Sequence, residues 1–141
     1  MVIFDTDHIS VMLQGTGSQY STISGRLLLS VDRDFATTAI TVEETLRGWL
    51  SRIRRARSRQ DEVPPYSKLV ETVQFYGGWK VAGFSVTAAD VFDDLRRQKI
   101  RIGTMDLKIA SIALAENALL LSANLGDFQL VPGLQVENWM H

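Results

Sequence analysis

The stretch Val2-Ile3-Phe4-Asp5 places three apolar residues directly before a carboxylate at the start of a 141-residue chain. A short apolar run bounded by an acid is typical of a buried strand in a parallel sheet. Similar runs recur four times, at residues 35–40, 79–85, 119–121 and 136–139. Because helical patterns lie between them, the sequence predicts an α/β fold in one domain over residues 1–141, with a central parallel sheet of about four to five strands flanked by helices on both faces.

The segments between these runs carry apolar residues at helical spacing. They predict helices at residues 10–14, 20–31, 41–59, 66–76 and 105–117. Thr41 and Glu44 match a capping box, so we expect the third helix to begin at Thr41. Pro64-Pro65 is expected to break the chain before the fourth helix. Thr87 is expected to cap a further short helix.

The composition excludes several classes of protein. The chain has no cysteine, which excludes a disulfide scaffold, thiol catalysis and cysteine-ligated zinc. Hydrophobic residues make up 45% and charged residues 22%, which argues against disorder. No apolar run reaches the roughly 20 residues of a membrane helix, and the first residues lack the basic region of a signal peptide. We therefore expect a cytoplasmic protein with no membrane partner.

Acidic residues fall where the chain leaves a strand or enters a helix. The four positions are Asp5, Glu44, Asp106 and Asp127. Each has an ordinary structural explanation: Glu44 as the capping partner of Thr41, for example, or Asp106 at a helix N-terminus. At one edge of the sheet, however, two carboxylates 4 Å apart repel each other by about 4 kcal/mol at an effective dielectric near 20. A divalent cation relieves that repulsion, and an all-oxygen ligand set selects Mg²⁺, with Mn²⁺ as a substitute, which suits phosphoryl chemistry.

The chain has only two histidines, His8 and His141. His8 lies near the expected site, but a lone histidine is more often structural than catalytic. His141 is terminal. A histidine-based nuclease or a Ser-His-Asp triad is therefore disfavoured.

Six arginines and no acid occur in residues 47–59. The simplest explanation is a solvated helix face. On a helical wheel, however, Glu44, Arg47 and Arg55 share one side, and Gly48 beside them permits close approach of another chain. Arginine binds either a phosphate or a partner's carboxylate through a bidentate fork, so RNA and a protein partner both remain open here. The overall net charge of −1 leaves −7 for the rest of the chain, so the mean charge does not exclude a nucleic-acid partner.

Four stretches together resemble one known family. They are Phe4-Asp5-Thr6-Asp7, residues 40–48 (ITVEETLRG), residues 102–110 (IGTMDLKIA) and residues 121–128 (LSANLGDF). The chain resembles the PIN-domain ribonucleases, in particular the VapC-type toxins of bacterial toxin–antitoxin pairs, over nearly its whole length. In the second stretch the family's acid stands four residues before a glycine, and this spacing selects Glu44 over Glu43.

The resemblance implies a Mg²⁺-dependent endoribonuclease that hydrolyses RNA phosphodiester bonds. Asp5 and Asp106 would hold the metal, while Glu44 and Asp127 position or deprotonate the attacking water. Asn124 stands directly after the strand, so Asp127 is assigned as the fourth acid because it is the nearby carboxylate. The resemblance also implies a homodimer that is neutralised by a VapB-like antitoxin.

Two alternatives remain open from the sequence. Asp5-Thr6-Asp7 after an apolar run also fits the start of a haloacid-dehalogenase-type phosphatase, in which Asp5 would be the nucleophile. Ile9 departs from that family's pattern, and Asp93-Asp94 falls inside an expected helix rather than in a loop after a strand. The second alternative is a PIN-like module that binds RNA or a partner without cutting; the intact acids argue against it.

Overall fold

The computed structural model describes all of residues 1–141. One sheet runs through it, in the strand order β3-β2-β1-β4-β5, and every neighbouring pair is parallel. The strands are β1 (Val2–Phe4), β2 (Phe35–Thr38), β3 (Lys80–Ala82), β4 (Leu119–Leu121) and β5 (Gln135–Glu137). The predicted α/β fold with a parallel sheet is confirmed, and the last strand, β5, lies at one edge of the sheet.

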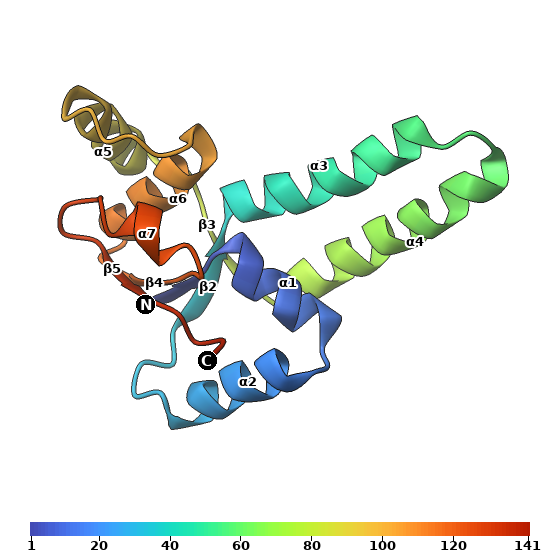
Figure 1. Cartoon of the computed structure of the whole chain (residues 1–141), viewed down its shortest axis with the longest axis horizontal. Helices are drawn as coiled ribbons and strands as arrows, with labels where there is room; N and C mark the ends of the chain where they lie inside the picture. The colour runs from blue at the N-terminus through green and yellow to red at the C-terminus, as the bar shows by residue number, and fades with distance from the viewer.

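Helices cover both faces of the sheet (Figure 1). They are α1 (Thr6–Gln14), α2 (Ser18–Leu29), α3 (Ala39–Arg55), α4 (Arg59–Tyr76), α5 (Val86–Arg97), α6 (Thr104–Ala115) and α7 (Leu125–Phe128). In Figure 1, α3 and α4 form a long hairpin that extends away from the sheet. None of the helices combines the length and apolar character that crossing a membrane requires.

The side chains of the central strands alternate between two hydrophobic clusters, as the period of a strand requires. Ile3 and Leu120 are fully buried in the cluster built with α5, α6 and α7. Phe4 and Leu121 are fully buried in the other cluster, with residues of α1, α2 and α4. Because both faces of the sheet are buried, the central strands are continuous apolar runs, and this pattern makes them recognisable in the sequence.

The start of α3 differs from the prediction. The second strand ends at Thr38 instead of residue 40, and Thr38 is the N-cap, whose Oγ1 accepts a hydrogen bond from the Thr41 N–H at 3.0 Å. The predicted capping box from Thr41 to Glu44 is therefore wrong, because Thr41 already lies in the first turn of the helix. Glu44 consequently has no capping role.

The two prolines also lie in a different place from the predicted break. Ser58 caps α4, and Pro64 and Pro65 sit inside the helix, in its second turn. A proline removes one i to i−4 hydrogen bond, but the residues four positions earlier, Gln60 and Asp61, are exposed, so water can solvate their carbonyls. The break lies earlier, at residues 56–58, so α3 ends at Arg55 rather than near residue 59.

Two further helix starts were predicted too late. The first helix begins at Thr6 rather than residue 10, because the Asp5 carboxylate accepts a hydrogen bond from the Thr6 N–H and caps it. The helix expected to start at Thr87 is capped by Ser85, whose Oγ accepts from the Ala88 N–H at 3.1 Å. Both starts follow a β-region residue with a short polar side chain, as N-caps require.

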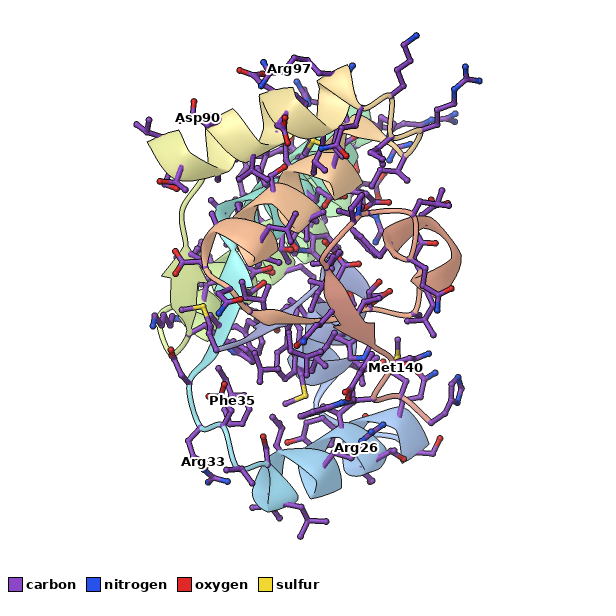
Figure 2. All side chains as sticks on the ribbon, turned by 90° about the vertical axis from the view of Figure 1, so that its left-hand side faces the viewer. Arg26, Arg33, Phe35, Asp90, Arg97 and Met140 are labelled. Carbon is purple, nitrogen blue, oxygen red and sulfur yellow. The ribbon has the colours of Figure 1, made fainter.

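The last four residues are held against α1 and α2. Arg26 of α2 donates from Nη1 to the Asn138 carbonyl at 3.1 Å, and its guanidinium lies over the Trp139 ring at 5.1 Å from the centroid. Figure 2 shows Arg26 next to the segment that carries Met140. Trp139 and Met140 are both buried, so this segment is part of the core.

Candidate active site

The strand order creates a topological switch point at the carboxyl end of β1. The chain continues from β1 to β2 on one side and later places β4 on the other side, so the connections leave in opposite directions. Such a switch point is where open α/β sheets bind ligands. Asp5 follows β1 and Ser122 follows β4 at this point, and the Asp5 N–H donates to the Leu121 carbonyl at 2.9 Å.

The Asp5 carboxylate is buried, and each of its oxygens accepts one hydrogen bond. Its Oδ1 accepts from the Thr6 N–H at 2.7 Å and its Oδ2 accepts from the Ser122 hydroxyl at 2.7 Å. Burial raises the pKa of Asp5 to about 6, and the negative charges of Asp7 and Asp106 act in the same direction, against the two hydrogen bonds. Burial and the neighbouring negative charges therefore destabilise the ionised form of Asp5.

Glu44 reaches the same edge of the sheet from the second turn of α3. The Thr6 hydroxyl donates to Glu44 Oε1 at 3.1 Å and lies 3.3 Å from the hydroxyl of Thr41. Burial raises the pKa of Glu44, and the charge of Asp106 adds to this effect. The first residue of α1 thus fixes a carboxylate of α3.

Asp106 and Asp127 are joined by an amide. Asn124 donates from Nδ2 to Asp106 Oδ2 at 3.2 Å and to Asp127 Oδ2 at 3.1 Å. Burial raises the pKa of Asp106, and the charge of Asp127 raises it further. Asn124 and Asp127 therefore both belong to this hydrogen-bonded cluster.

All four acids singled out from the sequence thus meet at one edge of the sheet. Asp106 is the common member, since its charge acts on the pKa of Asp5 and of Glu44, and the charge of Asp127 acts on Asp106. The sequence missed two hydroxyl groups that hold these acids, Thr6 and Ser122. The position of Ser122 directly after a buried strand is the same signal that identified Asp5.

The donor set fits a divalent cation in its chemistry. No three His, Asp or Glu side chains are already arranged around a common point to hold a metal ion. Hydroxyl and amide groups donate to several of the carboxylate oxygens. The pKa values of Asp5, Glu44 and Asp106 are all raised. A hard cation takes oxygen ligands and stabilises ionised carboxylates, so it would offset the repulsion among these acids.

A small hollow adjoins the acids along α1 and α3. It has a volume of about 180 Å³, and Glu44, Gly48 and Arg52 line it at successive turns of α3. A Cβ at Gly48 would have no heavy atom within 4 Å, so the hollow is open at this position. The guanidinium of Arg52 lies over the Trp49 ring at 5.1 Å from its centroid. Arg47 forms an ion pair with Glu43 instead.

Comparisons with known proteins find similar ribonucleases. The chain is 29% identical over 112 residues to the ribonuclease VapC2 of Rickettsia felis, covering 79% of each sequence. A chain of the crystal structure of VapBC2 from Rickettsia felis, bound to a DNA fragment from the promoter, superposes with a TM-score of 0.72 at 26% identity and 99% coverage of both chains. The chain is thus similar to VapC ribonucleases in both sequence and fold. No family model matches the sequence.

The VapC fold extends to more distant structures. A chain of the DNA-bound VapBC structure from Salmonella typhimurium gives a TM-score of 0.76 at 20% identity, covering 98% of this chain and 97% of that one. The resemblance to VapC proteins inferred from the sequence is thus confirmed. The ribonuclease interpretation is supported over the haloacid-dehalogenase and non-catalytic alternatives.

Proposed function

We propose that the protein is a metal-dependent endoribonuclease toxin that hydrolyses RNA phosphodiester bonds in the cytoplasm. The observation that carries this proposal is the group of four acids, Asp5, Glu44, Asp106 and Asp127, at the switch point of a sheet shared with VapC ribonucleases. Such carboxylates supply oxygen ligands and proton acceptors, the two requirements of metal-assisted phosphate hydrolysis.

Asp5 and Asp106 are the proposed metal ligands, with Mg²⁺ as the ion and Mn²⁺ as its substitute. When bound, the ion supplies charge stabilisation for the phosphate oxygens. Glu44 lies at the edge of the site, beside the open hollow, and its pKa is raised. A carboxylate with a raised pKa is better matched to accepting a proton from water near neutral pH. We therefore assign Glu44 to orienting and deprotonating the water, and Asp127 to assisting through Asn124.

Arg52 is the arginine that we assign to the RNA backbone. It lies two helical turns from Glu44, along the hollow that Gly48 leaves open. The eight residues from Glu44 to Arg52 rise about 12 Å along the helix axis, which is about two phosphate spacings of an extended strand. Stacking on Trp49 holds the guanidinium in place without neutralising it.

A VapB-like antitoxin and a homodimer complete the proposal. Several solved structures similar to this chain are VapBC complexes, including one from nontypeable Haemophilus influenzae. The positive residues 47–59 offer a second use in such a complex, because arginines also bind an antitoxin's carboxylates. Light scattering of the purified chain, alone and with the product of a neighbouring reading frame, measures both assemblies.

The experiment that tests the function is cleavage of structured RNA by the purified chain with Mg²⁺ or with EDTA. We expect discrete cuts with Mg²⁺ only. Asp106→Asn should abolish them, whereas Asp93→Asn, an exposed acid on α5, should cut like the parent chain. Equal cutting in EDTA, or by Asp106→Asn, would overturn the proposal.

A further inference from the structure

His8 is a buried histidine whose tautomer is set by its contacts. The ring is fully buried, and its Nε2 lies 3.1 Å from the Trp139 backbone N–H. A backbone N–H can only donate, so Nε2 is the acceptor and carries no proton. The proton of the neutral ring is therefore on Nδ1, which donates to Asp7 Oδ1 at 2.6 Å. His8 thus connects the C-terminal segment to Asp7.

Asp7 is in turn next to the hydroxyl that holds Asp5. The second oxygen of Asp7, Oδ2, accepts from the Ala123 N–H at 2.9 Å and lies 3.3 Å from Ser122 Oγ. Ser122 Oγ lies closer to Asp5 Oδ2, at 2.7 Å, and accepts from the Asn124 N–H at 3.0 Å. A serine hydroxyl has one proton to donate, so Asp5 and Asp7 compete for it.

The two donors on Asp7 decide this competition. Because His8 Nδ1–H and the Ala123 N–H satisfy one oxygen each, Asp7 keeps its charge without the Ser122 proton. The Ser122 hydroxyl is then free to donate to Asp5. Without the His8 donor, Asp7 would draw the Ser122 proton, and Asp5 would lose the hydrogen bond that orients it.

We propose that His8 is a positioning residue of the metal site, which holds Asp7 so that Ser122 can orient Asp5. This inference rests on the proposed metal-dependent function. His8 does not contact the ion or the RNA in this account. It acts through a continuous chain of hydrogen bonds from Trp139 through His8, Asp7 and Ser122 to Asp5, and links the buried C-terminal segment to the metal ligand.

A histidine that only fills the core would behave differently in two matched variants. The amide nitrogen of an asparagine overlays Nδ1 of a histidine, so His8→Asn keeps the donor to Asp7 and loses the acceptor for Trp139. The amide of a glutamine overlays Nε2, so His8→Gln keeps an acceptor for Trp139 and loses the donor to Asp7. Each variant loses one buried hydrogen bond, so a purely structural role predicts similar effects for both.

The first measurement is calorimetric titration of Mn²⁺ and Mg²⁺ into the parent chain and both variants, with thermal unfolding as a check on folding. We expect His8→Asn to bind the ions within about twofold of the parent chain. His8→Gln should bind them about 10- to 100-fold more weakly, which is the usual effect of mutating a residue that orients a metal ligand. RNA cleavage should require correspondingly more Mg²⁺ in His8→Gln.

A second measurement uses the parent chain and does not depend on how the variants fold. Ring ¹⁵N chemical shifts should show His8 protonated at Nδ1 and not at Nε2. Adding Mg²⁺ should shift the His8 Nδ1 signal through Asp7, while the exposed His141 serves as an internal control that does not move.

The outcomes separate this inference from the proposed function. If both His8 variants bind Mn²⁺ equally well while Asp106→Asn does not bind it, the positioning role is wrong and the metal-dependent function stands. Chemical shifts that show the His8 ring protonated at Nε2, or a His8 Nδ1 shift that does not change when Mg²⁺ is added, also overturn the positioning role. A parent chain that binds no divalent ion overturns both.

Discussion

At the scale of single residues, the ionised Asp5 carboxylate lowers the free energy of unfolding of the chain. It is 5% exposed and shares its surroundings with the negative charges of Asp7 and Asp106. Its pKa is raised from 3.8 to about 6, so the folded chain holds the proton more tightly than the unfolded chain does. The penalty for ionising Asp5 is absent below about pH 4, grows between pH 4 and 6, and is complete above pH 6.

This sign leads to a prediction for Asp5→Asn without metal. Since one pKa unit corresponds to 1.36 kcal/mol, removing the charge should stabilise the chain by up to about 3 kcal/mol at pH 8. The gain should nearly disappear at about pH 3, where Asp5 is largely protonated in both states. Urea unfolding in EDTA at the two pH values measures it. A variant with the same stability difference at both pH values would contradict the account.

Glu44 and Glu43 provide a matched pair for the catalytic assignment. Glu44 points into the cluster, where the Thr6 hydroxyl donates to it, whereas Glu43 pairs with Arg47 outside it. We expect Glu44→Gln to lower the RNA cleavage rate by roughly 100-fold or more, the usual worth of a general base. Glu43→Gln should stay within about twofold of the parent chain. The reverse order would show that the wrong glutamate is assigned.

The sequence could identify the acids but not the groups that hold them. Asp5 and Asp106 stand at strand ends and helix starts, a position that local patterns reveal. The partners come from distant parts of the chain: Ser122 reaches Asp5 across 117 residues and Thr6 reaches Glu44 across 38. Such pairs depend on strand order, which no local pattern contains.

At the scale of elements, the junction between β2 and α3 places Glu44 in the site. Thr38 pairs with Ala82 as the last residue of the strand and also caps the helix, so strand and helix meet with no loop between them. The sequence contains a capping box at Thr41, but the pairing of β2 with β3 ends at Thr38, and the helix begins directly after this residue. The turn between α3 and α4 also lies earlier than the prediction at Pro64-Pro65. Its position depends on packing between the two helices, which local sequence does not contain.

The cap at Thr38 has a measurable worth. Thr38→Ala should lower the free energy of unfolding by about 1 to 2 kcal/mol, because the Thr41 N–H then loses its partner in a buried position. Thr38→Ser retains the hydroxyl and should lose less. Urea unfolding compares the two. An equal loss in both variants would mean that the methyl group, and not the cap, is responsible.

Arg52 tests the RNA assignment of α3. Arg52→Ala should raise the KM for RNA several-fold and lower the slope of log affinity against log salt by about 0.7, the value for one phosphate contact on a single strand. Arg59→Ala is the control, because Arg59 is paired with Glu62 at the far end of the hairpin. If both variants bind RNA normally while Arg52→Ala weakens antitoxin binding, the arginines serve the antitoxin instead.

At the scale of the whole molecule, the net charge of −1 conceals a separation of charge. The six arginines of residues 47–59 belong to the α3–α4 hairpin, which extends away from the sheet (Figure 1). The acids gather at the carboxyl end of the strands. Glu44 joins the two regions, since it lies on the same helix as the arginines. A negative RNA backbone can therefore be held by the hairpin while one phosphate lies at the acids.

In the proposed reaction the acids activate a water molecule for attack on RNA. Mass spectrometry of the new RNA ends, after cleavage in ¹⁸O-labelled water with Mg²⁺, tests it most directly. We predict one ¹⁸O atom in each new terminal phosphate, no 2′,3′-cyclic phosphate, and no product with Asp5→Asn. Cyclic phosphate ends without the label, or labelled ends produced equally by Asp5→Asn, would contradict the claim.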